Sequence, residues 1–257
     1  MPVLMRPWGH MHFTDQGTGP AVVFANSLGT DLRMWGGVAL PGHRRIGFDK
    51  RGHGLSATPA TGWTVEDLAD DVAALMDHLG VARAVIAGCS VGGMVAMATA
   101  IRHPARCAAL VLSSTAAKIG TDESWQARIE AIETGGLGGL ADTIIDRWFS
   151  ASFRQSDEVL AWQTMLLRCD PVGYIGTCRA LASADLRAGV AGLALPVLML
   201  GGSHDPSTPP ALMAETAALI PDARLVVIDG SGHIPAIDAP DATARLIGDF
   251  LKGLPDD

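Results

Sequence analysis

Short apolar runs recur along the chain and predict the strands of a buried sheet. The runs that we take as strands are 21–25, 44–48, 84–87, 108–112, 196–200 and 224–228. Several are apolar at every position, which is typical of strands that helices cover on both faces. The segment 10–14 precedes the first buried run, and we expect it to form an antiparallel strand at the edge of the sheet.

Amphipathic segments lie between these runs and predict helices. In 64–79, Thr64 is followed three residues later by Asp67, which is close to a capping box. Apolar residues then recur at helical spacing. The segment 209–219 begins with prolines, which favour the start of a helix. The alternation of strand and helix patterns predicts an α/β fold with a mostly parallel central sheet.

The region 121–184 interrupts this alternation. It contains no convincing strand pattern and is mostly helical, with three of the six tryptophans. We therefore expect a helical cap at 121–184, inserted into a core made of 1–120 and 185–257.

Composition and charge narrow the class of function. Of 257 residues, 48% are hydrophobic and 18% are charged, which excludes a mainly disordered chain. The net charge is −8, and the lysines are Lys50, Lys118 and Lys252. A surface that follows a phosphate backbone needs clustered basic residues, so we expect neither a nucleic acid nor an anionic membrane as partner.

The four cysteines form no C-x-x-C pair, and the first ten residues lack a long apolar region and a cleavage site. Reduced cysteines and a cytoplasmic location are the expectation. The uncharged stretch 84–101 is long enough to span a membrane. Its central glycines favour a strand, a tight turn and a packed helix instead.

The segment 88–92, Gly-Cys-Ser-Val-Gly, has the pattern G-x-S-x-G. It follows the apolar run 84–87 and precedes the helix-compatible run 93–101. Such a strand–turn–helix context is that of a nucleophile elbow, which exposes its serine at the end of a strand. Ser90 is therefore the candidate nucleophile. The alternative is a glycine-rich turn that contains an incidental serine.

A serine nucleophile needs a base, and the base needs a carboxylate. His233 follows the run 224–228 and is the candidate base, although it could be an ordinary loop histidine. Asp205 follows the run 196–200 and is the candidate acid. Asp229 is its rival, but its closeness to His233 favours a turn-capping role. Ser90, Asp205 and His233 all follow strands, at the edge where open α/β sheets bind ligands.

An oxyanion hole needs two backbone N–H groups. We expect one from Val91, which follows the candidate nucleophile. We expect the other from Leu28, in the loop 26–29 that follows the run 21–25. An ordinary turn is the alternative for this loop.

Two further motifs carry less weight. The pair His10 and His12 resembles the start of a metal site, but the ligands that would complete one are missing at the needed spacing. The glycine-rich segment 135–139 has no preceding strand and no following lysine, so it is expected to join two helices. No metal and no other cofactor is expected.

Together these residues resemble the α/β-hydrolase superfamily and, within it, the 3-oxoadipate enol-lactonases. The resemblance covers nearly the whole chain. It includes 26–30 (NSLGT), 48–56 (FDKRGHGLS), 88–92, 123–128 (ESWQAR), 147–149 (RWF), 170–174 (DPVGY) and 203–210 (SHDPSTPP). Cys89 and Val91 depart from the leucine and methionine expected beside the serine. The segment 234–238 (IPAID) also departs from the pattern that follows the histidine.

The resemblance implies hydrolysis of an enol-lactone of aromatic catabolism to a 3-oxo diacid, through an acyl-enzyme at Ser90. Such a substrate carries a carboxylate, so the cap should supply cations and apolar walls. The candidate substrate-binding residues are Trp125, Arg128, Arg147, Trp148 and Arg179. Each arginine could instead be an exposed helix residue or a member of a structural ion pair.

Other functions fit the same residues. A carboxylesterase, a different lactonase or a cofactor-free perhydrolase would use the same three catalytic residues. A small-molecule receptor could keep them and turn over slowly, because a fold alone does not fix a function. The sequence carries no signal for the oligomeric state.

Overall fold

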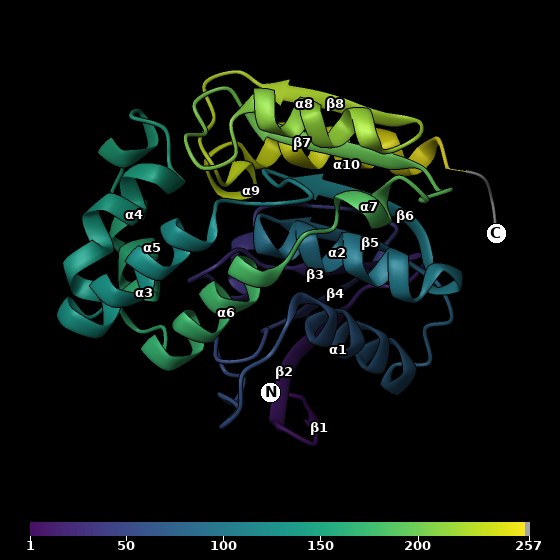
Figure 1. Cartoon of the computed structure of the whole chain (residues 1–257). Coiled ribbons are helices and arrows are strands. Elements are labelled where there is room, and N and C mark those ends of the chain that lie inside the picture. Colours follow the sequence, from purple (N-terminus) through teal and green to yellow (C-terminus); the bar gives the residue numbers. More distant parts are fainter. Residues whose placement is uncertain (255–257) are drawn as a thin grey trace.

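The computed structural model describes residues 1–254 and shows a central sheet flanked by helices (Figure 1). The strands are β1 (Val3–Arg6), β2 (Gly9–Gln16), β3 (Ala21–Ala25), β4 (Arg44–Phe48), β5 (Ala84–Cys89), β6 (Cys107–Ser113), β7 (Val197–Gly202) and β8 (Ala223–Ile228). They form one eight-stranded sheet in the order β1-β2-β4-β3-β5-β6-β7-β8. From β4 to β8 all neighbours are parallel.

Each of the six predicted apolar runs falls on a strand, except that Pro196 lies just before β7. The predicted α/β fold with a mostly parallel sheet is confirmed. The prediction for 10–14 is right about the antiparallel strand β2 and wrong about its place. The edge strand is β1, which pairs with β2 through a tight hairpin. β1 has only four residues, half-buried at alternate positions, and is too short to give a pattern in the sequence.

The helices lie between and around the strands. They are α1 (Val65–His78), α2 (Val91–Arg102), α3 (Asp122–Gly135), α4 (Ala141–Trp148), α5 (Glu158–Leu167), α6 (Pro171–Ser183), α7 (Arg187–Val190), α8 (Pro210–Leu219), α9 (Pro235–Asp238) and α10 (Pro240–Lys252). Short 3₁₀ helices are η1 (Leu32–Trp35), η2 (Pro104–Arg106), η3 (Leu137–Leu140) and η4 (Phe153–Gln155).

The helices divide into two groups. In the first, α2 packs on β5 and β6 and also contacts α1, while α8 packs on β7 and β8. α9, α10 and η1 form a separate set of contacts on β3, β4 and β7. The buried strands belong to one continuous apolar core. In the second, α3 to α6 lie together on the left of Figure 1, on the side to which the arrow of β8 points. These helices account for the region without strands.

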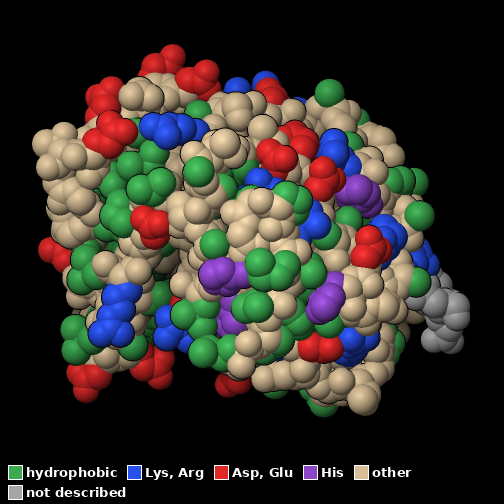
Figure 2. Space-filling view, turned by 90° about the horizontal axis from the view of Figure 1, so that it is seen from below, with side chains coloured by type: hydrophobic (Ala, Val, Ile, Leu, Met, Phe, Trp, Pro, Cys, Tyr) green, Lys and Arg blue, Asp and Glu red, His purple; other side chains and the backbone are tan. Residues whose placement is uncertain are grey.

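The uncharged stretch 84–101 consists of β5, a tight turn and most of α2. Among residues 1–254, no helix is both long and apolar enough to cross a bilayer. On the face seen in Figure 2, lysine and arginine side chains are scattered among acidic ones and do not form one broad patch.

The N-terminus of α1 has the capping box that the sequence indicates. Thr64 Oγ1 accepts a hydrogen bond from the Asp67 amide at 3.2 Å, and Asp67 Oδ2 accepts one from the Thr64 amide at 2.8 Å. Two amides that lack partners within the helix are satisfied in this way.

Replacing Thr64 by alanine should lower the free energy of unfolding by about 1 kcal/mol, because an N-cap hydroxyl is lost. Urea denaturation followed by circular dichroism measures this change. Thr61→Ala is the matched control, since Thr61 is exposed and lies before the helix. Equal stability of both variants and the parent would show that the box contributes nothing.

Candidate active site

Ser90 stands at the turn between β5 and α2 in a strained backbone conformation. Its φ is 57° and its ψ is −120°, a region that residues other than glycine rarely occupy. The Ser90 amide donates to the Ser113 carbonyl at 2.9 Å, and Thr115 Oγ1 donates to the Ser90 carbonyl at 2.7 Å. These contacts hold the turn and leave the side chain at the end of the strand, as a nucleophile elbow requires.

Two glycines make this turn possible. A Cβ at Gly92 would lie 2.2 Å from the carbonyl oxygen of Ala25, and a Cβ at Gly88 would lie 2.0 Å from that of Gly92. Any side chain at either position would push α2 away from β3 and β5. Cys89 is fully buried within the packed side of the turn, where burial raises the pKa of its thiol.

His233 and Asp205 form a buried pair. His233 Nδ1 lies 2.8 Å from Asp205 Oδ2. The carboxylate also accepts hydrogen bonds from the Ser207 amide, the Thr208 amide and Thr208 Oγ1, at 2.8, 3.0 and 2.6 Å. Because an ionised carboxylate can only accept, Nδ1 carries the proton and Nε2 is free to act as a base.

Opposing effects set the charge of Asp205. Burial alone would raise the pKa of this carboxyl group. The charge of His233 and the hydrogen bonds from His233 and Thr208 outweigh burial and lower the pKa to about 2. Asp205 is therefore ionised at neutral pH and can hold the imidazole in one tautomer.

The rival acid and a neighbouring histidine lie elsewhere. Asp229 accepts a hydrogen bond from Ser203 Oγ at 3.1 Å at the surface, which fits a turn-capping role. His204 is exposed, and its backbone amide donates to the Ser231 carbonyl. Of the two candidate acids, the structure brings Asp205 to His233.

Ser90 and His233 line one cavity of about 390 Å³. Within the described chain, Ser90 Oγ makes no hydrogen bond to His233, and such bonds are often long before a substrate binds. Leu28 lines the same cavity, and Val91 opens α2 directly after Ser90. In residues 1–254 the amides of Leu28 and Val91 donate to no protein acceptor, so both are free to bind an oxyanion.

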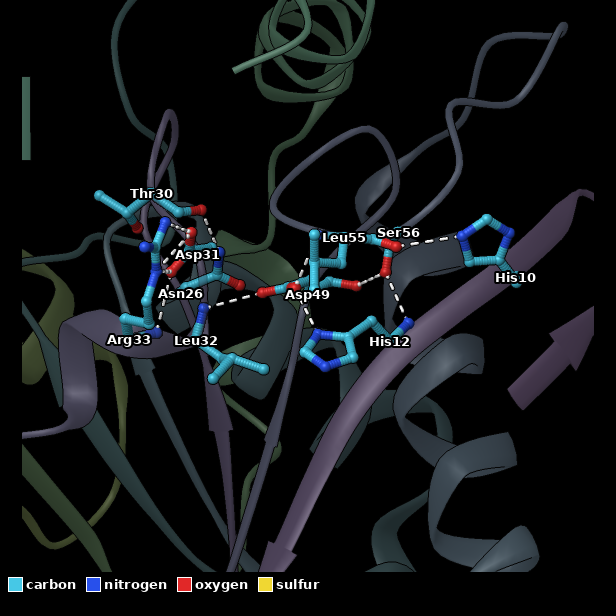
Figure 3. Close-up of polar contacts among 10 residues, drawn as sticks. All are labelled: His10, His12, Asn26, Thr30, Asp31, Leu32, Arg33, Asp49, Leu55 and Ser56. Atoms are coloured by element: carbon cyan, nitrogen blue, oxygen red, sulfur yellow. Dashed lines mark hydrogen bonds and ion pairs between the residues drawn. The ribbon is translucent and has the colours of Figure 1, made fainter. Parts of the chain in front are cut away.

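Polar contacts centred on Asp49 join β2, the start of η1 and the turn after β4 (Figure 3). Asp49 accepts hydrogen bonds from the amides of Leu32 and Leu55, at 2.8 and 2.9 Å, and its Oδ2 lies 2.8 Å from His12 Nδ1. His10 instead contacts the Leu55 carbonyl at 3.1 Å. The two histidines thus have separate partners. No cluster of three His, Cys, Asp or Glu side chains suited to a metal occurs in the described residues.

Two of the three candidate arginines reach the cavity. Arg128 and Arg147 line it, together with the apolar rings of Trp125 and Trp148. Arg128 Nη1 donates to Tyr174 Oη at 3.1 Å, and its guanidinium lies 5.8 Å from the centre of the Trp125 ring. Across residues 1–254, neither arginine has a carboxylate partner. Both positive charges are therefore available to a ligand.

Arg179, the third candidate, does not line this cavity. It lies on α6 beside a different surface hollow, 3.6 Å from Glu133. The expectation that an arginine at this position faces the substrate is not met, because the phase of α6 points it to the outside of the helical group.

Sequence reasoning missed several residues that build the site. Thr208 Oγ1 donates a hydrogen bond to the carboxylate of Asp205. Asp238 accepts hydrogen bonds from the Gly232 amide at 2.7 Å and from Ser231 Oγ at 2.5 Å, and so holds the loop before His233. An acidic residue five positions after the histidine is the only trace of this contact in the sequence.

Comparisons with known proteins show the family to which the chain belongs. The model of the alpha/beta hydrolase family matches residues 22–246. A protein named 3-oxoadipate enol-lactonase 2, from Acinetobacter baylyi, is 36% identical over 242 residues, which are 92% of this chain and 90% of that protein.

Solved structures give the same result. The enol-lactonase from Burkholderia xenovorans LB400 has a TM-score of 0.94 and 36% identity, over 98% of this chain and 100% of that chain. A thermophilic esterase from Thermogutta terrifontis has a TM-score of 0.89 and 31% identity, over 95% and 93% of the two chains. The predicted resemblance and fold class are confirmed, and the chain belongs to the alpha/beta hydrolase family.

Proposed function

We propose that this enzyme is a serine hydrolase that opens the ring of an anionic enol-lactone, with 3-oxoadipate enol-lactone as substrate and 3-oxoadipate as product. The observation that carries the proposal is the cavity itself. It joins Ser90 and the His233–Asp205 pair to two guanidinium groups that have no carboxylate partner among residues 1–254. The similarity to proteins named enol-lactonases supports this choice of lactone.

In the first step, Ser90 Oγ attacks the lactone carbonyl while His233 Nε2 takes its proton. The amides of Leu28 and Val91 bind the oxyanion, and each is worth about 3–4 kcal/mol if it resembles other such donors. Collapse of the tetrahedral intermediate breaks the ring C–O bond and releases an enolate, which is protonated through His233.

The leaving group stays attached to the acyl-enzyme and could close the ring again. Tautomerisation of the enol to the ketone removes this internal nucleophile and favours ring opening. His233 then takes a proton from water, which attacks the acyl-enzyme. Ser90 recovers its proton, and the 3-oxo diacid leaves. These steps require no cofactor.

Residues 121–184 act as the cap in this proposal, and 1–120 with 185–257 as the catalytic core. The core supplies the serine, the histidine, the carboxylate and the oxyanion hole. The cap supplies Arg128 and Arg147 for the substrate carboxylate. Trp125 and Trp148 cover the apolar part of the ring.

The catalytic residues are tested with purified protein and the ultraviolet absorbance of 3-oxoadipate enol-lactone. Ser90→Ala should lower kcat roughly 10⁶-fold, as nucleophile removal does in other serine hydrolases. Asp205→Asn should lower kcat about 10⁴-fold, because the wrong imidazole tautomer is then favoured. Asp229→Asn is the matched control and should keep full activity.

The outcomes separate the competing functions. Ser90-dependent turnover of p-nitrophenyl acetate without turnover of the lactone would support an esterase and would reject 3-oxoadipate enol-lactone as the substrate. Lactone turnover that survives Ser90→Ala would reject the mechanism. Ligand-dependent stabilisation with no hydrolysis would favour a receptor.

The anchoring arginines are tested by charge removal. Arg128→Met and Arg147→Met should each raise KM for the anionic lactone roughly 10- to 100-fold, since hydrogen bonds to charged groups contribute about 1.5–3 kcal/mol. Both should leave kcat/KM for neutral p-nitrophenyl acetate nearly unchanged. Arg179→Met is the matched control and should change neither. An unchanged KM for the lactone would exclude that arginine as an anchor.

A further inference from the structure

Lys50 is a buried lysine directly beneath the loop that carries Leu28. Its side chain is 3% exposed, although lysine is almost never fully buried without a partner. It lies between β4 and the turn 51–54, and no carboxylate forms an ion pair with it within residues 1–254. Its acceptors are backbone carbonyl groups.

The ammonium group of Lys50 donates to the Ser27 carbonyl oxygen at 2.5 Å and to the Thr30 carbonyl oxygen at 3.3 Å. The carbonyl of Ser27 and the amide of Leu28 belong to the same peptide group. In a trans peptide these two groups point in opposite directions, and this chain has no cis peptide bond among its described residues. Lys50 therefore binds this peptide on the side opposite the Leu28 N–H, and both Ser27 and Leu28 line the cavity.

We propose that Lys50 is a positioning residue of the oxyanion hole: its ammonium group fixes the Ser27–Leu28 peptide plane and polarises the Leu28 N–H toward the substrate oxyanion. This inference rests on the proposed serine mechanism. Hydrogen bonds in a chain strengthen one another, and a charged donor is about twice as strong as a neutral one. The Leu28 amide becomes a better donor when the carbonyl behind it is bound by a cation.

A second contact from the same turn supports the loop. The Gly29 amide donates to His53 Nε2 at 3.1 Å. The Arg51 carbonyl, 3.0 Å from His53 Nδ1, can only accept, so Nδ1 carries the proton. Burial lowers the pKa of His53 well below its usual value, and Lys50 lowers it further. His53 is therefore a neutral, fixed acceptor, and the charge behind the loop belongs to Lys50.

The surroundings of Lys50 make its charge sensitive to pH. Burial lowers the pKa of the ammonium group to about 7, against the opposing effect of nearby acidic groups. The titratable groups that face it are Cys169, Asp49, Asp31, Cys89 and His53. Burial raises the pKa of both thiols, so they are neutral at this pH. The ammonium form predominates below pH 7 and the amine above it.

Substitution at Lys50 should leave the loop folded. The Ser27 carbonyl also accepts hydrogen bonds from the Thr30 amide at 3.2 Å and from Thr30 Oγ1 at 2.9 Å. Without Lys50 this oxygen keeps two donors. Lys50→Met removes the charge and the donor at similar length, whereas Lys50→Gln offers a neutral donor. Lys118→Met is the matched control, because Lys118 pairs with Asp185 at the surface.

The first experiment measures Ser90-dependent hydrolysis of p-nitrophenyl acetate from pH 6 to pH 9. Lys50→Met should lower kcat roughly 10- to 100-fold at pH 6, part of the loss seen when an oxyanion donor is removed. KM should change by less than about twofold, because the contact acts in the transition state. The ratio of the parent kcat to the Lys50→Met kcat should shrink as pH rises through about 7. At pH 6 the kcat of Lys50→Gln should lie between those of the parent and Lys50→Met.

A ratio near one at all pH values would overturn the proposal. A loss of kcat that is the same at every pH, and the same in Lys50→Gln and Lys50→Met, would also overturn the proposal. Such a result would indicate a purely structural role for Lys50. Lys118→Met should match the parent throughout.

The second experiment does not depend on turnover. In the Ser90→Ala protein labelled with ¹⁵N-leucine, the Leu28 amide proton should shift with a midpoint near pH 7, and the shift should disappear when Lys50→Met is added. Absence of Ser90-dependent hydrolysis would reject the proposed mechanism and leave this titration to decide the role of Lys50. A Leu28 resonance with the same pH response in both proteins would overturn the proposal.

Discussion

The parallel register of the sheet is the constraint on which the site depends. Ala25 pairs with Gly88, Cys89 with Ser113, and Gly202 with Ile228, so β3, β5, β6, β7 and β8 end along one edge. Ser90 follows its strand at once, and Asp205 and His233 follow theirs within a few residues. Short connections from paired strands leave little freedom, so Asp205 and His233 meet at hydrogen-bond distance and Ser90 lines the same cavity as His233.

Two buried charged groups lie near this edge, Asp205 and Lys50, and pH affects their contributions to stability in different ways. Asp205 accepts hydrogen bonds from three backbone or hydroxyl donors and from His233, and the pKa of its carboxyl group falls to about 2. Its pairing therefore stabilises the fold above the unfolded pKa, and this stability is lost as pH falls toward about 2.

Within residues 1–254, Lys50 has only carbonyl acceptors, and burial lowers the pKa of its ammonium group to about 7. The unfolded chain binds this proton more tightly than the folded chain does, so the folded state gains stability as pH rises from about 7 toward the unfolded pKa. Below pH 7 the protein carries a charge that its fold disfavours. The buried charge of Lys50 therefore lowers the stability of the folded protein. A destabilising group retained next to the Ser27–Leu28 peptide is consistent with the proposed role in transition-state binding.

The sequence was enough to predict most of the sheet, because continuous apolar runs, glycines at 88 and 92, and prolines at helix starts act locally. The elbow and the pairing of Asp205 with His233 followed from their places after strands. Contacts that depend on how the chain packs could not be predicted from the sequence. Thr208 and Lys50 lie in segments that carry the resemblance and Asp238 in one that departs from it, but no local pattern indicates which groups they bind. Thr208 and Asp238 bind groups three to seven residues away, and Lys50 binds a carbonyl 23 residues away. The edge strand β1 was not predicted, because its four residues are too few to show a pattern.

The candidate arginines also show what the sequence could not predict. Which of them lines the cavity depends on how the helices pack. Trp125 and Arg128 are three residues apart on α3 and so share one helix face, and that face lines the cavity. Arg179 lies on α6, which packs against α3, yet it contacts Glu133 on the outer side. Helical phase decides which arginine lines the cavity, whereas the strand register places Ser90, Asp205 and His233 along one edge of the sheet. α3 and α4 contribute no strand to the sheet. Under the proposed function, a change in their residues would therefore alter the choice of substrate without disturbing Ser90, His233 or Asp205. Such a division is consistent with a similarity that extends to both an enol-lactonase and an esterase over almost the whole chain.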